Sequence, residues 1–426
     1  MAVEAVRSCV PLAKRSDVQS IHMASTTYPY EELSGSAVVA AASGLNRRIR
    51  SSNTAGNARA ATSLLIASAF AQDNGALIVA SERQNPAPGG AAEMNCGAGA
   101  AAFCLGSENV RARIIATASH SVHFVDQFRA TGRDENYMWE ERWVRDEGYL
   151  TLIPPVVDEV LGKAGICIED VGHFVFPSSI RGGAKALAKG IGFSGRVSGD
   201  FEAEIGFCGS AHGAISLVEA LAHAKAGDKI LMIGFGQGVD AVLFEATELC
   251  ESDMLAACFK AAIDRMRLTA DYLRMASFYG RIALDWGPRS EKAGKAALAE
   301  QYRSSGQLDT FSAGVCPDCG TVQFPVLAYC VNVHCQASLK GAQSRSLIDE
   351  PASIFTITND WLSFHPAPPL SVGFVQFENG SRVLMEVVDA APEEIAEGLQ
   401  VEMRFRIKER DKLRGYNRYF WKATPA

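Results

Sequence analysis

The sequence of 426 residues has no apolar run long enough to cross a lipid bilayer. Apolar runs such as Leu231–Gly234 and Ala98–Leu105 fall far short of the roughly 20 residues that a membrane-spanning helix needs. The first residues, MAVEAVRSCV, contain a glutamate and lack the basic region and the apolar core of a secretory signal peptide. We therefore expect a protein without a membrane segment or a signal peptide.

The sequence also lacks an excess of positive charge. Its 41 lysine and arginine residues and 48 aspartate and glutamate residues give a net charge of −7. Because nucleic-acid binding depends on clustered positive charge, this balance argues against a nucleic-acid partner. Hydrophobic residues at 48% and charged residues at 21% are typical of a folded protein with a core. At about 150 residues per domain, the length indicates two or three domains.

Paired cysteine spacing is absent from most of the chain. Seven of the eleven cysteines are scattered among apolar or helical stretches, whereas four lie in one window of twenty residues. These four are Cys316, Cys319, Cys330 and Cys335. A scattered odd set beside one tight cluster indicates a reducing compartment and one metal site, not a disulfide framework. We therefore expect a cytoplasmic protein.

The sequence does contain an internal repeat. At an offset of 153 residues, Gly56–Ala71 aligns with Gly209–Ala224 without gaps, and eight of the sixteen residues are identical. Strand-like apolar runs lie before and after each copy. Each half therefore reads as strand, loop, helix of small residues, strand and a further strand, which predicts an α/β fold with a mostly parallel sheet. Helices so rich in alanine, glycine and serine are expected deep inside, where larger side chains would not fit.

Duplicated halves with a central helix of small residues resemble the thiolase superfamily. The similarity to its hydroxymethylglutaryl-CoA synthase and ketoacyl synthase III branch becomes specific in DVQSIHMASTTYP, GAAEMNCGAGAAAF, WEERWVRDEGY, HFVFPSSIRGGAKALAKGIGF and KILMIGFGQGVDAVLFEAT. This resemblance covers about residues 1–250. It implies a duplicated α/β/α/β/α domain over residues 1–249 and a role in acyl-CoA chemistry.

The first half begins late relative to the second. A strand at 113–120 and a helix precede Asp170, whereas only a helix precedes the matching Asp17. We therefore expect the opening strand of the first half to be missing. Loss of a strand would expose backbone donors and acceptors on a new sheet edge, so we expect a displaced start codon rather than a natural truncation.

As the resemblance implies, the N-termini of the two central helices converge on the reaction centre. The first helix then presents a nucleophilic cysteine, and histidine and asparagine, or two histidines, from the second half activate or polarise the acyl group. In this sequence, Asn53 or Thr54 stands where the cysteine is expected. Pro177 and Phe207 stand where the histidine and the asparagine are expected, and Thr26 replaces a catalytic glutamate. A covalent Cys–His–Asn mechanism is therefore not supported.

Other side chains in the same loops are candidates for the chemistry. Cys208 and His212 flank the start of the second central helix, where a helix N-terminus beside a histidine would activate a thiolate. The alternative is that both side chains are buried and only packed. Asp146 and Tyr149 belong to the segment 126–149, which is either a lid that carries acid–base residues or a solvated, salt-bridged excursion.

Two further features suit an acyl-CoA ligand. Arg181, Lys185 and Lys189 are spaced four apart on an expected helix, and this basic stripe fits either the phosphates of CoA or plain solvent. Gly234 and Gly236 would let the backbone approach a thioester closely, or would only form a tight turn.

The sequence predicts a helical connector over residues 250–312. The four clustered cysteines follow this segment. Their spacing is C-x2-C, ten residues, and C-x4-C. Two close pairs at this distance predict a zinc ribbon over residues 313–340, because four thiolates complete a tetrahedron around structural zinc. His334 adjoins the last cysteine, but four cysteines suffice as ligands.

Residues 341–426 contain five strand-like runs, which predicts an OB-type barrel. Asn379 and Gly380 predict a hairpin turn between the second and third runs. OB folds often bind single-stranded nucleic acid. From Cys316 onward, however, 11 basic against 13 acidic residues give 11 − 13 = −2, which argues against that ligand. The module resembles the zinc-ribbon–OB domain that accompanies thiolase-like acyl-CoA enzymes, which implies a part in forming the acyl-CoA entrance.

These features together predict an acyl-CoA-dependent enzyme that makes or breaks a C–C bond β to the thioester. Without a cysteine nucleophile, we expect a non-covalent retro-aldol or retro-Claisen step. Helix N-termini around Asn53 and Gly206–Gly209 would stabilise the enolate oxygen, and Tyr149, Asp146 or His212 would move the proton. The alternatives are an inactive scaffold that binds acyl-CoA or a catalytic thiolase partner and, more weakly, a nucleic-acid-binding protein. We expect a homodimer or heterodimer through the thiolase-like domain.

Overall fold

The computed structural model describes residues 1–72, 74–199, 201, 203–250, 252–291 and 297–426. Over these residues the chain divides into two compact units. The first unit comprises Met1–Ala40 and Leu45–Met266, and the second comprises Ala41–Gly44 and Arg267–Ala426. In the described chain, no helix has both the length and the apolar character needed to span a membrane.

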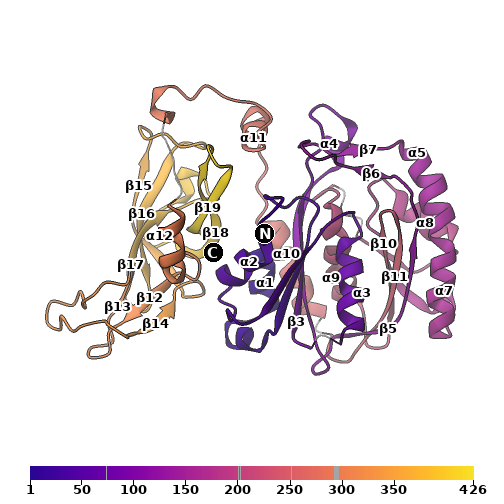
Figure 1. Ribbon diagram of the computed structural model, residues 1–426, viewed down its shortest axis with the longest axis horizontal. Helices are drawn as coiled ribbons and strands as arrows, with labels where there is room; N and C mark the ends of the chain where they lie inside the picture. The colour runs from indigo at the N-terminus through magenta and orange to yellow at the C-terminus, as the bar shows by residue number, and fades with distance from the viewer. Residues whose placement is uncertain (73, 200, 202, 251, 292–296) are drawn as a thin grey trace. The chain divides into compact units, whose positions relative to one another are not determined.

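The first unit contains one sheet from each half of the repeat (Figure 1). The first sheet consists of β1 (Ser20–Ala24), β2 (Arg50–Thr54), β3 (Ala76–Arg83) and β4 (Ala98–Leu105). Its order is β2-β1-β3-β4, with β1 parallel to β2 and β3, and with β4 antiparallel to β3. The carboxyl ends of β1, β2 and β3 therefore lie at one edge of the sheet.

The second sheet repeats this arrangement and adds a strand. It consists of β5 (Ala112–Ser121), β8 (Val171–Val175), β9 (Arg196–Ser198), β10 (Lys229–Phe235) and β11 (Gly238–Ala246), in the order β5-β11-β10-β8-β9. Strand β8 is parallel to β9 and β10, and β11 is antiparallel to β10 and β5. The repeat is thus confirmed, and within the described residues the first sheet has no counterpart of β5, as its late start predicts.

Two helices of small residues lie between the sheets (Figure 1). They are α3 (Ala60–Phe70) and α9 (His212–His223), the two copies of the repeated segment. Helix α3 contacts strands of both sheets, among them β3 and β10, and α9 contacts β4 and β8. Ten of the twelve residues of α9 are buried, so the expectation of deeply placed helices is confirmed.

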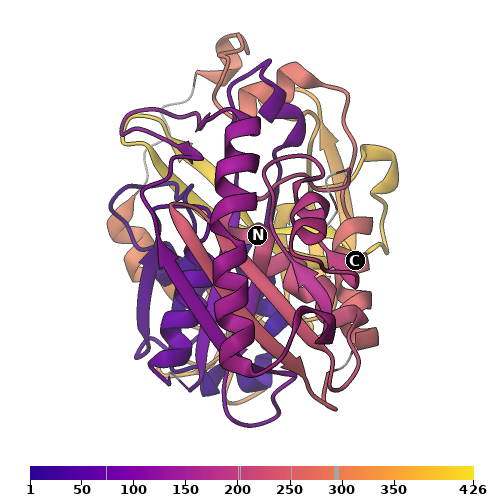
Figure 2. The same ribbon diagram turned by 90° about the vertical axis from the view of Figure 1, so that its right-hand side faces the viewer.

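Further helices cover the outside of the first unit. A helical run of α5 (Glu141–Trp143), the π-helical Val144–Tyr149, α6 (Leu150–Leu152) and α7 (Pro154–Ala164) crosses the second sheet (Figure 2). The buried side chains of α7 belong to the same apolar cluster as Ala241 and Leu243 of β11. The other helices of this unit are α1 (Ala2–Cys9), α4 (Ala91–Asn95), α8 (Gly183–Gly190), α10 (Ser252–Asp264) and all but the last two residues of α2 (Gly35–Ala42).

The segment expected to be a helical connector is divided between the units. Helix α10 belongs to the first unit, where the ring of Phe259 lies 5.3 Å from that of Phe201. The helices α11 (Tyr272–Phe278), α12 (Leu298–Arg303) and α13 (Ser305–Leu308) belong to the second unit. Residues 292–296 of the expected connector lie outside the described residues.

The second unit contains a small sheet and a barrel. The small sheet has the order β13-β12-β14, from β12 (Ser312–Val315), β13 (Val322–Gln323) and β14 (Gln343–Ser346). The barrel consists of β15 (Ala352–Asp360), β16 (Leu370–Phe377), β17 (Arg382–Glu386), β18 (Gln400–Asp411) and β19 (Tyr416–Pro425). All five predicted strands are confirmed, and Gly380, at φ +89°, lies in the turn between β16 and β17.

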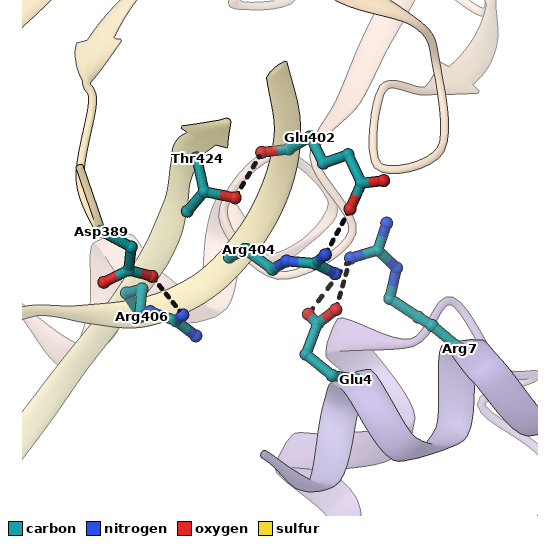
Figure 3. Close-up of polar contacts among 7 residues, drawn as sticks. All are labelled: Glu4, Arg7, Asp389, Glu402, Arg404, Arg406 and Thr424. Carbon is teal, nitrogen blue, oxygen red and sulfur yellow. Dashed lines mark hydrogen bonds and ion pairs between the residues drawn. The ribbon is translucent and has the colours of Figure 1, made fainter. Parts of the chain in front are cut away.

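The barrel has the OB order β17-β16-β15-β18-β19. The amide of Val388 donates to the carbonyl of Ala423 at 2.8 Å, which links the β17 edge to β19 and closes the barrel. On the outside, Arg406 of β18 pairs with Asp389 at 2.6 Å, and Arg404 pairs with Glu402 (Figure 3). The side chains of Arg406 and Asp389 are 36% and 50% exposed, so their pair contributes at most about 1 kcal/mol.

The interior of the barrel centres on Trp421. Its side chain is fully buried, and its ring lies 5.2 Å from that of Phe405. Its indole Nε1 donates to the carbonyl of Asp309 at 2.8 Å. The barrel is therefore stabilised mainly from inside, by apolar burial and one satisfied indole.

We predict that Trp421→Ala lowers the free energy of unfolding of the second unit by about 3–5 kcal/mol, because a large cavity replaces a buried ring. Hydrogen exchange of the β18 and β19 amides measures this in the full chain. Trp361 is 66% exposed and is the matched control, and Trp361→Ala should change the value by no more than about 0.5 kcal/mol. Equal effects of the two substitutions would contradict this view of the core.

Candidate active site

A buried carboxylate lies where the two halves of the first unit meet. Glu82, near the carboxyl end of β3, is 1% exposed. It accepts hydrogen bonds from the backbone N–H and hydroxyl of Thr26, both at 2.7 Å, from the Ser210 hydroxyl at 2.5 Å and from Gln84 Nε2 at 3.3 Å. The Ser25 hydroxyl lies at 3.5 Å. Thr26 follows β1 and Ser210 precedes α9, so both halves of the repeat hold this one group.

The N-terminus of the other central helix, α3, is also held by contacts to a buried carboxylate. Arg59, next to α3, donates to Asp240 of β11 at 2.8 Å and to the carbonyl of Gly236 at 2.9 Å. The Ser63 hydroxyl donates to the same carboxylate at 2.5 Å. Each central helix is therefore tied near its N-terminus to an acidic side chain of the opposite sheet.

Sequence reasoning missed Glu82. Its signal was a charged residue near the end of ALIVASER, an otherwise apolar strand. A charge in such a place is unfavourable unless other groups of the fold satisfy it.

Part of the segment 126–149 contacts the residues that hold this carboxylate. Its strands β6 (Gln127–Phe128) and β7 (Tyr137–Met138) form a hairpin. Arg129 Nη2 donates to the carbonyl of Thr26 at 2.5 Å, and Asn136 Nδ2 donates to Gln84 Oε1. Both contacts reach residues that bond Glu82. This placement favours the lid interpretation over the solvated excursion.

Cys208 and His212 are brought together, but as packed side chains. The Cys208 side chain is fully buried, and burial raises the pKa of its thiol to about 12. His212 Nδ1 accepts from the backbone N–H of Cys208 at 3.2 Å, and its Nε2 donates to the carbonyl of Gly199 at 3.1 Å. Burial lowers the pKa of His212, so the ring is neutral with both nitrogens bonded. The geometry thus favours the packed alternative over an activated thiolate.

Phe207 reinforces that packing. Its side chain is buried at the position expected for an asparagine, and its ring lies 5.6 Å from the His212 ring. The Phe201 ring lies 5.4 Å from the His212 ring. The imidazole therefore lies near two aromatic rings.

Asp146 and Tyr149 differ sharply in environment. Tyr149 is buried between Phe176 and Phe235, with ring centroids at 4.8 and 5.0 Å. Its hydroxyl lies 3.1 Å from the Ser179 hydroxyl, and burial raises its pKa, so it stays protonated. Asp146 is 45% exposed, and a 2.7 Å hydrogen bond from Arg145 lowers its pKa. Of the two, only Tyr149 is enclosed by protein.

The structure corrects the placement of Asn53. It lies within β2, paired with Met23, and its Oδ1 accepts from the backbone N–H of Ser36 at 3.0 Å. Helix α3 begins only at Ala60, after a turn in which Asn57 Oδ1 accepts from the amide of Arg59 at 3.2 Å. Asn53 is therefore not at a helix N-terminus, where the prediction had placed it.

Gly234 and Gly236 are required by close contacts within the protein. A Cβ atom on Gly234 would lie 2.7 Å from the Thr62 hydroxyl. A Cβ atom on Gly236, at φ +155°, would lie 3.1 Å from the amide nitrogen of Ala58. Both glycines therefore let the β10–β11 turn approach the start of α3.

The basic stripe is exposed but only partly helical. Helix α8 begins at Gly183, after Gly182 at φ +70°, so it contains Lys185 and Lys189 but not Arg181. All three side chains are exposed. The expectation of three basic residues on one helix is corrected to two, with the third just before it.

The four clustered cysteines form a group that can hold a metal ion. The sulfur atoms of Cys316, Cys319, Cys330 and Cys335 all lie within 4.8 Å of one another. The Sγ atoms of Cys316 and Cys335 are 3.7 Å apart, and those of Cys319 and Cys330 are 3.6 Å apart. A tetrahedral zinc site with Zn–S bonds of about 2.3 Å needs S–S separations of roughly 3.8 Å. The cluster therefore fits zinc and is consistent with a zinc ribbon.

Comparison with known proteins agrees with this architecture. The family model described as "ChsH2, C-terminal OB-fold domain" matches residues 352–406. Over 301 residues the chain is 25% identical to the hydroxymethylglutaryl-CoA synthase of Methanothermobacter thermautotrophicus, which covers 67% of this chain and 85% of that protein. It is 28% identical over 256 residues to the hydroxymethylglutaryl-CoA synthase of Methanocella arvoryzae, which covers 58% of this chain and 73% of that protein.

Solved structures show the same fold over about two thirds of the chain. PksG, an HMG-CoA synthase from Bacillus subtilis, matches with a TM-score of 0.58 at 16% identity, over 69% of this chain and 83% of that one. An HMG-CoA synthase complexed with CoA matches with a TM-score of 0.54 at 18% identity, over 69% of this chain and 82% of that one. The chain thus combines a thiolase-like fold, similar in sequence to hydroxymethylglutaryl-CoA synthases, with an OB fold.

We predict that Cys208 does not react with iodoacetamide in the folded protein at pH 8, because its buried thiol remains protonated. Mass spectrometry of peptides after labelling measures the modified fraction. The exposed Cys258 is the internal control and should label readily. Labelling of Cys208 as fast as Cys258 would restore the thiolate interpretation.

Proposed function

We propose that the first unit binds an acyl-CoA thioester and makes or breaks a C–C bond β to the thioester carbonyl. Support comes from the sequence similarity to hydroxymethylglutaryl-CoA synthases over 67% of the chain and from the thiolase-like fold. The observation that carries a non-covalent mechanism is the state of Cys208. Its thiol is fully buried with a raised pKa, so it is not available to form an acyl-enzyme.

The reaction that fits is a retro-aldol or retro-Claisen cleavage, or its reverse. Such a step needs a hydrogen-bond donor for the enolate oxygen and a group that moves a proton. Tyr149 is the proposed donor, because burial keeps its hydroxyl protonated. The exposed Lys185 and Lys189, with Arg181 before them, are the proposed contacts for the phosphates of CoA.

A second candidate function is an inactive acyl-CoA-binding subunit of a catalytic thiolase. The observation that favours it is the packing of Cys208 and His212 beside Phe207, which occupies a position expected for a catalytic asparagine. Both ring nitrogens of His212 are hydrogen-bonded within this buried cluster. Under either function, we propose structural zinc on the four cysteines, a cytoplasmic location, and a homodimer or heterodimer formed through the thiolase-like domain.

We predict that the purified protein, mixed with a set of β-hydroxyacyl- and β-ketoacyl-CoA thioesters, releases a shortened acyl-CoA. Chromatography of the CoA products measures the turnover, and intact-protein mass spectrometry should find no attached acyl group. The variant Cys208→Ser should retain the turnover. An acyl-enzyme would contradict the non-covalent mechanism, and CoA binding without turnover would establish the second candidate.

We predict about one zinc ion per chain by elemental analysis of protein purified under reducing conditions. Cys319→Ser should lose the metal, because a four-thiolate site cannot close with three. Cys258→Ser, which changes a cysteine outside the cluster, should keep it. Protein with four reduced cysteines and no metal would overturn the zinc assignment.

A further inference from the structure

We propose that Glu82 is the group that moves the substrate proton, and that the hairpin of residues 127–138 controls access to it. This inference rests on the proposed function and names its missing acid–base residue. It also names the substrate class for which a carboxylate base suffices, the β-hydroxyacyl-CoA thioesters.

Burial of the Glu82 charge costs free energy. Two other buried carboxylates pair with arginine, Asp240 with Arg59 at 2.8 Å and Glu219 with Arg196 at 2.6 Å. Asp126 is also buried, and burial raises the pKa of its carboxyl to about 6. Glu82 accepts only from neutral donors, and among the described residues no lysine, arginine or histidine pairs with it. A buried charge without a cation is expensive, and a purely structural role would be served better by a neutral side chain.

The position of Glu82 in the sheet also supports this role. Ligands of α/β folds bind at the carboxyl ends of parallel strands, and Glu82 lies near the carboxyl end of β3, beside the residues that follow β1. Its contact with the backbone of Thr26 also joins it to the loop that follows β1.

The hairpin of residues 127–138 contacts the groups that hold Glu82. Arg129 bonds the carbonyl of Thr26, whose amide and hydroxyl both donate to Glu82. Asn136 bonds Gln84, whose side chain also donates to Glu82. Two residues of the hairpin, Arg129 and Asn136, therefore each contact a residue that donates a hydrogen bond to Glu82. Displacement of the hairpin would loosen Thr26 and Gln84 together and free lone pairs on Glu82.

The proposed cleavage reaction balances without a co-substrate. The Glu82 carboxylate removes the proton of the β-hydroxyl group, a C=O bond forms at Cβ, and the Cα–Cβ bond breaks. Its electron pair moves into the thioester as an enolate, and the carbonyl fragment leaves. The protonated Glu82 then returns the proton to Cα, which gives the shortened acyl-CoA and restores the carboxylate.

The test compares Glu82→Gln with wild type on the β-hydroxyacyl-CoA thioesters that wild type cleaves. Loss of a general base should lower kcat by about 10²- to 10⁴-fold, while the dissociation constant of CoA changes less than about threefold. Glu82→Asp keeps the charge and should recover part of the lost rate. Glu219→Gln, which removes another buried carboxylate, is the matched control and should leave kcat unchanged.

Asn136→Ala tests the hairpin, because it removes the contact with Gln84 and leaves Glu82 intact. It should change KM more than kcat. Wild-type turnover that survives in Glu82→Gln would overturn this inference and leave the proposed function standing. Absence of turnover in the wild type would overturn both.

Discussion

The first unit depends on two helices that are shared by two sheets. Helices α3 and α9 lie between the sheets, and each is fastened near its N-terminus to an acidic side chain of the opposite half. Arg59 and Ser63 hold α3 to Asp240, and Ser210 holds α9 to Glu82. Only small residues allow the helices to approach both sheets so closely, and this constraint brings loops from the two halves to one place.

The two contacts that hold the helices, at Asp240 and at Glu82, lie in similar positions but differ in the charge of the groups around the carboxylate. The carboxylate of Asp240 is balanced by a guanidinium, so its burial is compensated and a structural role accounts for it. The carboxylate of Glu82 is surrounded by hydroxyl, amide and backbone donors instead. Sites that depart from the most stable arrangement are typically functional sites. The asymmetry within a duplicated fold therefore singles out one of its two junctions as the place for chemistry.

Much of the architecture could be predicted because its signals are local. The repeated small residues of α3 and α9, the alternating barrel strands and the spacing of Cys316 to Cys335 are each contained in a short stretch of sequence. The sequence could not decide whether Cys208 is reactive or buried, because its burial depends on residues that are distant in sequence. One of them is Gly99, where a Cβ atom would lie 3.3 Å from the Cys208 sulfur. Glu82 was missed for the same reason, because its partner Ser210 lies 128 positions away.

The predicted positions of two residues were wrong because the helices begin later than the sequence pattern indicates. The sequence places Asn53 at the N-terminus of a helix that begins only at Ala60, and it places Arg181 within a helix that begins only at Gly183. In both places a turn precedes the helix, formed by the Asn57 side chain in one case and by Gly182 at positive φ in the other. Helical spacing identifies the body of a helix, but the start is decided by such a turn.

The most direct measurement is a crystal structure with a non-cleavable thioether analogue of a β-hydroxyacyl-CoA. The account predicts that the β-hydroxyl group of the analogue lies about 2.6–3.2 Å from a Glu82 carboxylate oxygen, with no covalent bond to the protein. An analogue bound elsewhere, with Glu82 still enclosed by Thr26, Gln84 and Ser210, would contradict it.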